Sequence, residues 1–361
     1  MSWDSAIRSK LQGKKIFVTG HNGFKGSWLV SWLAFYDCEI IGYSLGLPDK
    51  SLYGDAGLSS IVNREYIGDI RDFDNVKSSL KEVQPDLILH LAAQSLVRFS
   101  YKEPLETWST NVQGTATVLQ AARLCPSVKA VLVVTSDKCY ENMEWAWGYR
   151  ESDRLGGYDP YSASKAATEL VVSSFIKSFS DNGGSNIASA RAGNVIGGGD
   201  WSKDRLVPDA VRAIQENGEL LIRSPHATRP WQHVLDCLHG YLLLAATLLD
   251  RPSSLTGTRA FNFGPDSSGN LEVADFLDRM VRDIPKLKWS VVDDLEGTPD
   301  PHEAGILFLD SSLSRKILGW SPRWNVDKAI SATADWYIRY MDRSESANDL
   351  MKRQLKEYLS E

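Results

Sequence analysis

The sequence predicts an α/β protein with a doubly wound parallel sheet, and three observations lead to this prediction. Short apolar runs recur along the first half of the chain, at 15–19, 39–43, 87–91, 130–135 and 187–191. Segments with apolar residues at helical spacing separate them, among them 23–36, 74–83, 110–124 and 162–179. Strands that alternate with helices form a parallel sheet covered on both faces. The third observation is a glycine-rich turn directly after the first run, which is typical of a Rossmann-like nucleotide-binding fold.

The glycine-rich turn links the first predicted strand to the first long helix. It reads Gly20-His21-Asn22-Gly23-Phe24-Lys25-Gly26. Glycines there allow a tight turn, let backbone N–H groups approach a pyrophosphate and let the helix pack closely, while the helix N-terminus favours an anion. We therefore predict a dinucleotide site in this turn, formed by Gly20, Asn22, Gly23, Phe24 and Gly26.

The second and third strands bear on the choice of dinucleotide. The second strand leads into Ser44-Leu45-Gly46, which offers neither a carboxylate for a ribose hydroxyl nor an arginine for a 2′-phosphate. The sequence therefore favours NAD and leaves NADP open. A further apolar run lies between the runs at 39–43 and 87–91 and counts as the third strand; Asp69 and Ile70, which follow it, are predicted to line the adenine pocket, with Asp69 accepting a hydrogen bond from the exocyclic amine. Asp72 is predicted to cap the following helix.

The fourth strand ends in His90-Leu91-Ala92-Ala93-Gln94, at the edge where a doubly wound sheet binds its ligand. Small residues let a cofactor lie against the backbone, so we expect Leu91, Ala92 and Ala93 beside its ribose and nicotinamide. Gln94 is expected beside the substrate, and His90 is expected to be a buried histidine with satisfied hydrogen bonds. Asn111, on an otherwise apolar helix face, is expected to orient the catalytic strand through hydrogen bonds.

The residues that indicate chemistry follow the fifth strand and begin the helix at 162–179. Tyr161 and Lys165 are four residues apart, so both lie on one helix face and the ammonium can lower the pKa of the phenol. Such a pair is a base for an alcohol proton and is typical of hydroxyl oxidation. Ser136, Asp137 and Lys138 add a hydroxyl, an acid and an amine nearby. Simple oxidation needs neither the acid nor the amine, which indicates an elimination; the alternative is a polar strand end that caps the next segment.

The character of the chain changes at about residue 191. Glycine- and proline-rich loops follow, marked by Gly197-Gly198-Gly199, Pro208, Pro225 and Pro230. Long loops in a compact protein are usually functional. We predict a nucleotide-binding domain over 1–190 and a smaller, mainly substrate-binding lobe over 191–361, with some segments returning to the first domain.

Composition excludes several classes of function. The 361 residues can bury a large core, and 46 acidic against 40 basic side chains give a net charge of −6. No run of like charges stands out, so nucleic acid and anionic membranes are not expected as partners. Neither a signal peptide nor a membrane-length apolar stretch is apparent, and a cytoplasmic location is expected. The four cysteines are far apart, with no Cys-x-x-Cys pair, so neither a metal site nor a disulfide framework is predicted.

Together these motifs resemble the extended short-chain dehydrogenases/reductases of the nucleotide-sugar type. The resemblance rests on the glycine turn, on Tyr161-x-x-x-Lys165 and on the run at 191–201. Within this family, the segments that resemble the CDP-glucose 4,6-dehydratases are 20–28, 135–140, 145–151, 156–161, 204–208, 229–234 and 309–324. The likeness runs from about residue 11 to about residue 340. Two positions depart from the pattern: Ala163 replaces an expected asparagine, and Gly46 lies where some relatives carry an acid.

The resemblance implies a bound NAD and a three-step reaction on a nucleotide sugar. Tyr161, supported by Lys165, takes the C4 hydroxyl proton while hydride leaves C4, and Ser136 donates a hydrogen bond to that oxygen. Tyr161 and Lys165 also contact the cofactor. Lys138 is the implied base for the C5 hydrogen, and Asp137 is the implied acid for the departing C6 hydroxyl. The hydride then returns to C6, which gives a 4-keto-6-deoxy sugar for deoxysugar biosynthesis.

Substrate contacts are expected in the loop-rich half of the chain. A nucleotide diphosphate needs cationic partners, and Arg205 and Arg229 are the candidates. Asn194 is expected to bind the same group, with Leu206 beside Arg205. Asn262 and His302 are weaker candidates near the ribose and base, and ordinary hydrogen bonding within loops is the alternative for each.

The family also implies a homodimer through the helices at 110–124 and 162–179. Three other functions stay open: a nucleotide-sugar 4-epimerase, a dehydratase for another nucleotide hexose, and an NAD-binding regulator without catalysis.

Overall fold

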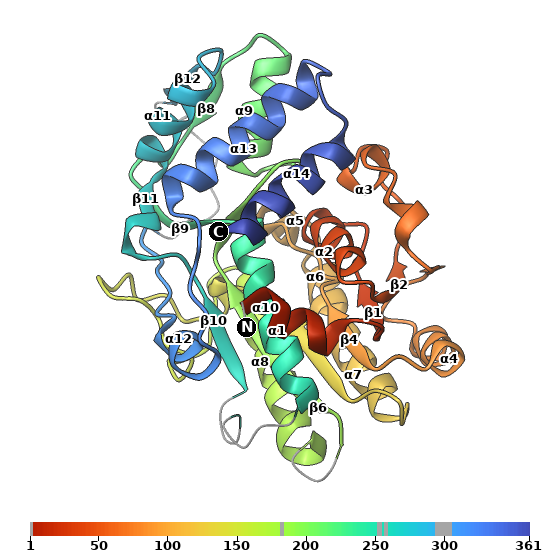
Figure 1. Cartoon of the computed structure of the whole chain (residues 1–361). Helices are drawn as coiled ribbons and strands as arrows, with labels where there is room; N and C mark the ends of the chain where they lie inside the picture. The colour runs from red at the N-terminus through yellow and green to blue at the C-terminus, as the bar shows by residue number, and fades with distance from the viewer. Residues whose placement is uncertain (1–2, 181–183, 251–254, 256–258, 293–304) are drawn as a thin grey trace.

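A seven-stranded parallel sheet forms the centre of the molecule (Figure 1). The structure is a computed structural model and describes residues 3–180, 184–250, 255, 259–292 and 305–361. The strand order is β10-β6-β5-β4-β1-β2-β3, and every neighbouring pair is parallel. The strands are β1 (Lys15–Thr19), β2 (Glu39–Ser44), β3 (Arg64–Ile67), β4 (Leu87–His90), β5 (Ala130–Val134), β6 (Asn186–Ala192) and β10 (Ala260–Phe263). The predicted doubly wound parallel sheet is confirmed.

Helices cover both faces of this sheet, and alternate residues of the strands supply the two cores. In β1, Ile16 and Val18 join the core that contains α2 (Phe24–Phe35) and α10 (Val234–Asp250). Phe17 instead joins the core that contains α4 (Phe73–Val83), α7 (Gly114–Arg123) and α8 (Pro160–Phe175). A strand buried on both faces is apolar throughout, which is why these strands read as continuous apolar runs.

Several helix ends follow directly from the sequence. Asp72 accepts a hydrogen bond from Asn75 N at 3.1 Å and caps α4, as predicted. Asp159 accepts from Ser162 N at 2.9 Å at the start of α8, where Pro160 occupies the first turn. The predicted helix at 110–124 begins as a π-helical turn, η2 (Ser109–Gln113), before α7, and a second π turn, η4 (Ile176–Ser180), follows α8.

The second half of the chain builds two small sheets beside the carboxyl ends of the large one. One contains β7 (Asn194–Ile196), β9 (Thr228–His233) and β11 (Asn270–Glu272), and the other pairs β8 (Leu220–Ile222) with β12 (Trp289–Val291). The helices here are α9 (Leu206–Gln215), α11 (Val273–Asp283), α12 (Ser312–Leu318), α13 (Val326–Met341) and α14 (Ala347–Ser360). The later elements β10 and α10 belong to the layers of the large sheet, so the chain returns from the second half to the first. The domain boundary at residue 190 stays a prediction.

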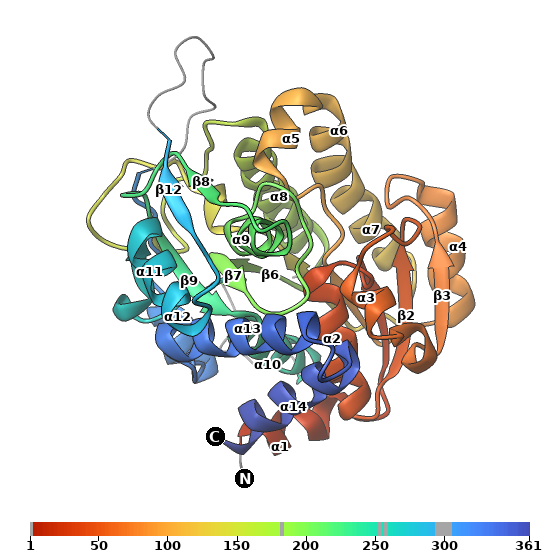
Figure 2. The same ribbon diagram turned by 90° about the horizontal axis from the view of Figure 1, so that it is seen from above.

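The remaining elements are short connections, apart from the N-terminal helix α1 (Trp3–Leu11), which lies beside α14 (Figures 1 and 2). Trp3 of α1 packs against His239 and Tyr358, with ring centroids 4.2 and 6.1 Å away. The short elements are α3 (Leu52–Asp55), η1 (Leu58–Ile61), α5 (Val97–Lys102), α6 (Pro104–Trp108), η3 (Asp137–Cys139) and η6 (Ser267–Gly269). In the described parts of the chain, no helix has both the length and the apolar character needed to cross a membrane.

Candidate active site

A pocket of about 1390 Å³ lies at the carboxyl ends of the parallel strands and is lined by both halves of the chain. A doubly wound sheet binds its ligands at this edge. The volume exceeds the roughly 300–1,000 Å³ of a typical single-ligand site, so the pocket has room for a dinucleotide and a second ligand. The predicted site residues that line it are Gly20, Asn22, Gly23, Phe24, Gly26, Asp69, Ile70, Leu91, Ala92, Ala93, Gln94, Ser136, Asp137, Lys138, Tyr161, Lys165, Asn194, Arg205, Leu206 and Arg229.

The glycine turn has the geometry of a dinucleotide cradle. Gly20 has a φ of +71°, and a Cβ there would lie 2.8 Å from the backbone nitrogen of Ala92. A Cβ on Gly26 would lie 2.1 Å from the carbonyl oxygen of Gly20, so these two positions admit only glycine. Gly23 precedes the first residue of α2, and no described side chain caps this helix end. Backbone N–H groups of the turn can therefore bind an anion at the helix N-terminus.

The loop after β2 is joined to the glycine turn. Asn22 Nδ2 donates to the carbonyl oxygen of Leu45 at 2.9 Å. His21 is buried, and its ring nitrogens lie 2.9 Å from Ser44 Oγ and 2.8 Å from Glu65 Oε1. Asn22 thus lines the pocket while it fixes the conformation of the loop.

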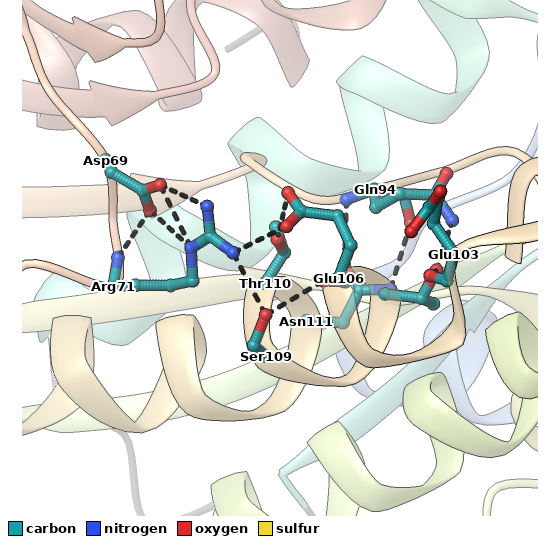
Figure 3. Close-up of polar contacts among 9 residues, drawn as sticks. Asp69, Arg71, Gln94, Glu103, Glu106, Ser109, Thr110 and Asn111 are labelled. Carbon is teal, nitrogen blue, oxygen red and sulfur yellow. Dashed lines mark hydrogen bonds and ion pairs between the residues drawn. The ribbon is translucent and has the colours of Figure 1, made fainter.

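The predicted adenine end of the pocket contains an arginine that the sequence did not single out (Figure 3). Arg71 Nε lies 2.9 and 3.0 Å from the two carboxylate oxygens of Asp69, and Arg71 Nη1 donates to Glu106 Oε2 at 2.7 Å and to Ser109 Oγ at 3.0 Å. The hydrogen bonds from Arg71 hold the pKa of Asp69 below its usual range. Both carboxylate oxygens of Asp69 already accept hydrogen bonds from Arg71. The predicted role of Asp69 as an acceptor for the adenine amine would therefore share the carboxylate with Arg71.

Asn111 orients the segment after β4 and not the catalytic strand, which corrects the sequence-based expectation (Figure 3). Its Oδ1 accepts from Gln94 N at 2.8 Å, and its Nδ2 donates to Gln94 O and to Ser164 Oγ, both at 2.9 Å. The Gln94 side chain donates to Thr107 Oγ1 at 2.7 Å. His90 is buried between Thr19 and Thr115, at 2.6 and 3.1 Å, which confirms its predicted structural role.

Tyr161 and Lys165 lie on one face of α8, at the end of β5. Burial raises the pKa of Tyr161 to about 12, although a hydrogen bond with Ser136 and the charge of Arg205 act to lower it. Lys165 Nζ lies 3.4 Å from the carbonyl oxygen of Val134. Burial, followed by the charge of Lys25, lowers the pKa of Lys165 to about 8. In this protein Ser136 and Arg205 therefore support ionisation of the phenol more directly than Lys165 does.

Asp137 is a buried carboxyl group whose pKa is raised above its usual range. It is 2% exposed, and burial raises its pKa, opposed mainly by the charge of Lys138. Ser136 Oγ donates to Asp137 Oδ1 at 2.9 Å, whereas Oδ2 has no hydrogen-bond partner among the residues that the structure describes. Ser136 Oγ also accepts from Lys138 N at 3.2 Å and caps η3. The capping role predicted as the alternative for Ser136-Asp137-Lys138 is therefore present, and it does not exclude a chemical role.

Two arginines from the second half of the chain reach the same end of the pocket. Arg205 Nη1 donates to Asp200 Oδ2 and Arg205 Nη2 donates to Ser95 Oγ, both at 3.0 Å. The charge of Arg205 acts on Tyr161, and the charge of Arg229 acts on Asp137. Both cations therefore lie within electrostatic reach of the catalytic groups.

Asn262 is not part of the pocket, which corrects its prediction as a substrate contact. Its side chain is 0% exposed and lies among the loops at 140–151 and 310. Tyr140 Oη donates to Asn262 Oδ1 at 2.7 Å, and Asn262 Nδ2 donates to the carbonyl oxygens of Tyr149 and Asp310 at 2.8 and 3.1 Å. With these bonds made, its role is structural. His302 lies outside the described residues.

Sequence reasoning missed several charged groups at the site, namely Lys25, Arg71, Arg98, Asp200 and Asp204. Lys25 lies within the glycine turn and donates to Tyr241 Oη at 3.4 Å, and a basic residue inside such a turn was a signal that could have been followed. Arg98 Nη1 lies 3.7 Å from Asp204 Oδ1 and joins the segment after β4 to the loop before α9. Arg71 also pairs with Asp69, two residues away, and Asp200 with Arg205, five residues away, so these local pairs could have been noticed too. The pairs of Arg71 with Glu106 and of Arg98 with Asp204 join distant segments, which carry no local pattern.

Comparisons with known proteins agree with this fold. The model of the NAD dependent epimerase/dehydratase family matches residues 16–264, and the chain belongs to this family. A CDP-glucose 4,6-dehydratase of Salmonella typhimurium is 44% identical over 359 residues, which cover 97% of each chain. A probable dTDP-glucose 4,6-dehydratase of Sinorhizobium fredii is 25% identical over 90% of this chain and 93% of its own.

Solved structures support the fold. An epimerase of Methanothermobacter thermautotrophicus superposes with a TM-score of 0.77 at 21% identity, covering 94% of this chain and 96% of that one. A dTDP-glucose 4,6-dehydratase of Bacillus anthracis in complex with NAD superposes with a TM-score of 0.74 at 19% identity, covering 91% and 97%.

Proposed function

We propose that the chain is an NAD-dependent CDP-glucose 4,6-dehydratase, which converts CDP-D-glucose to CDP-4-keto-6-deoxy-D-glucose and water. The observation that carries this proposal is the meeting of two pairs in one pocket: Tyr161 with Lys165, and Asp137 with Lys138. The first pair suits oxidation at C4, and the second suits loss of water from C5 and C6. Similarity over nearly the whole chain to the Salmonella enzyme supports the choice of CDP-glucose.

The residues of the cradle fit NAD. Gly20 and Gly26 admit no side chain, and the turn before α2 presents backbone N–H groups to a pyrophosphate. Ser44 and Leu45 line the pocket at the end of β2 and offer neither a carboxylate nor an arginine to a ribose, so preference over NADP rests on the family. When bound there, NAD accepts a hydride from the sugar and later returns it.

Tyr161 is the base for the C4 hydroxyl. A phenol with a pKa near 12 holds its proton at neutral pH, so a cation must favour its ionisation during the reaction. Arg205 and the ammonium of Lys165 provide that charge, and Ser136 provides a hydrogen bond. Oxidation comes first because a C4 ketone makes the C5 hydrogen acidic.

Lys138 and Asp137 serve the elimination. Lys138 is half-buried, lines the pocket and removes the C5 proton once it is neutral, or stabilises the enolate while it is charged. Asp137 has a raised pKa and an Oδ2 with no described partner, so a proton on that oxygen can pass to the departing C6 hydroxyl. Arg205, Arg229 and Asn194 are assigned to the diphosphate, since arginine binds phosphate oxygens with two parallel donors.

The test is incubation with CDP-glucose in heavy water, followed by NMR of the product. The proposal expects a 4-keto-6-deoxyhexose that carries deuterium at C5. CDP-galactose without loss of water would instead identify a 4-epimerase. A panel of CDP-, dTDP-, UDP- and GDP-hexoses identifies the base, and tight NAD binding without turnover on any of them would indicate a regulator.

A homodimer and a cytoplasmic location complete the proposal. Leu105 and Trp108 of α6 and Leu170 of α8 are exposed apolar residues on or next to the helices assigned to the interface. Exposed apolar side chains that gather on one face favour association. Sedimentation at micromolar protein that shows only monomer would contradict the dimer.

A further inference from the structure

A buried ion pair lies behind the catalytic strand end and has no part in the steps above. Glu169 lies on α8, one turn after Lys165, and Arg191 lies near the end of β6. Arg191 Nη2 donates to Glu169 Oε2 at 2.7 Å, and the two side chains are 4% and 3% exposed. Removing two charges from water is unfavourable, and further hydrogen bonds are needed to offset this cost. The groups that supply these hydrogen bonds indicate which part of the protein the pair holds in place.

The carboxylate of Glu169 is bonded to the strand end that leads into the catalytic residues. Thr135 Oγ1, immediately before Ser136, donates to Glu169 Oε1. Ser189 Oγ of β6 donates to Glu169 Oε2 at 2.7 Å. Arg191 Nη1 donates to Tyr140 Oη at 2.7 Å, immediately after η3. The ion pair is therefore bonded to both ends of the segment 135–140 that carries Ser136, Asp137 and Lys138.

Lys165 is the catalytic group that the charge of Glu169 reaches. The two residues are four apart and share a face of α8. The pKa of Lys165 is lowered to about 8 in total. Burial is the largest cause and the charge of Lys25 from α2 the next, whereas the Glu169 carboxylate acts to raise it. Without this carboxylate, burial and the charge of Lys25 would lower the pKa of Lys165 further.

The other titratable groups that face Lys165 are uncharged at neutral pH. Burial raises the pKa of the Cys139 thiol on η3, and burial lowers the pKa of the His90 imidazole on β4 to about 3. Tyr161, one turn earlier on α8, has a pKa raised to about 12. Glu169 is therefore the anion that favours the ammonium form of Lys165.

We infer that Glu169 is a positioning residue: its carboxylate keeps Lys165 in the ammonium form and holds Thr135, and with it Ser136, in place. The kinetic consequence rests on the proposed function, because Lys165 supports Tyr161 in that reaction. The charge state of Lys165 can be measured without substrate, so its titration tests the inference separately from the proposed function.

The direct test is a pH titration of Lys165 in the Glu169→Gln variant. The titration is monitored by NMR of protein labelled with ¹³C at lysine Cε. The Lys165 resonance is assigned from Lys165→Arg. Loss of the carboxylate is expected to lower the proton affinity of Lys165 by about tenfold or more, so that its titration midpoint moves to lower pH. The alkaline limb of the pH profile of kcat for CDP-glucose should move the same way, while KM changes little.

Ser189→Ala is the matched control, because it removes one donor from the same carboxylate and changes no charge. Its Lys165 midpoint is expected to equal that of the wild type. Where Glu169→Gln folds poorly, Glu169→Gln with Arg191→Met leaves neither charge of the pair and should shift the midpoint in the same direction. An unmoved midpoint in a folded variant without the carboxylate would overturn the inference. Inactivity of the wild type on every nucleotide hexose would overturn the proposed function, while the NMR titration would still decide this inference.

Discussion

The two ends of the pocket each have an arginine–carboxylate cluster, and the clusters differ in exposure. Arg191 and Glu169, behind the catalytic end, are 4% and 3% exposed. Arg71, Asp69 and Glu106, at the predicted adenine end, are 32%, 31% and 43% exposed (Figure 3). Water screens the second cluster, so its net contribution to stability is small, whereas the charges of the first act on their neighbours at low dielectric. The comparison teaches that similar ion pairs can have different functions. The buried pair sets the charge of Lys165 and the position of the segment 135–140, whereas the partly exposed cluster can adjust to a ligand.

The largest expected effect is on the buried pair. Glu169→Gln leaves Arg191 as an unpaired buried cation, which should lower the free energy of unfolding by about 3–5 kcal/mol. Urea unfolding followed by fluorescence measures this change. A loss below about 1 kcal/mol would show that the pair behaves like a surface pair.

An intermediate effect is expected at Asp137, which is buried and whose Oδ2 has no hydrogen-bond partner within the described part of the chain. Asp137→Asn should lower the turnover rate by about 10²–10⁴-fold, because the acid for the C6 hydroxyl is lost. It should also raise the free energy of unfolding at neutral pH by about 1 kcal/mol, because folding of the wild type must either add a proton to Asp137 or bury its charge, whereas the amide is neutral in both states.

The pH dependence of this stabilisation tests its cause. The folded-state pKa of Asp137 is raised, so the unfolded state loses its proton first as pH rises, and the wild type is penalised above the unfolded pKa. The advantage of Asp137→Asn over the wild type should therefore shrink as pH falls toward about 4. An advantage that does not change with pH would assign it to packing.

The smallest effect is expected at the half-exposed cluster. Arg71→Met should cost about 0.2–1 kcal/mol of unfolding free energy, and less in high salt, because exposed pairs are screened. Arg71→Lys is the control that keeps the charge. NAD binding measured by calorimetry on both variants separates a role toward the ligand from one toward the fold. A loss above about 3 kcal/mol would remove the distinction between the clusters.

Local patterns predicted most of the sheet, the glycine turn and the common position of Tyr161 and Lys165 on α8 in the pocket. The strand at 15–19 and the turn at 20–26 could be predicted because their conformations depend on residues close in sequence. Asp72 as a helix cap was readable for the same reason. Tyr161 and Lys165 were readable because helical spacing alone places them on one face.

Contacts between distant segments could not be predicted in this way. Glu169 and Arg191 come from a helix and a strand, and nothing near either residue in the chain indicates the partner. Asn262 was a weak candidate for the ribose and base, with loop hydrogen bonding as the alternative, and its bonds to the carbonyl oxygens of Tyr149 and Asp310 favour that alternative. Asn111 was expected to orient β5, but the π turn that contains it directs its amide to Gln94.

The most direct test of the proposed function is to follow the hydrogen at sugar C4. CDP-glucose labelled with deuterium at C4 should give a 4-keto-6-deoxy product that carries that deuterium at C6, because the hydride removed at the start returns at the end. Deuterium that remains at C4 of a CDP-hexose, or a 4-keto-6-deoxy product with C6 hydrogens from solvent alone, would contradict the account.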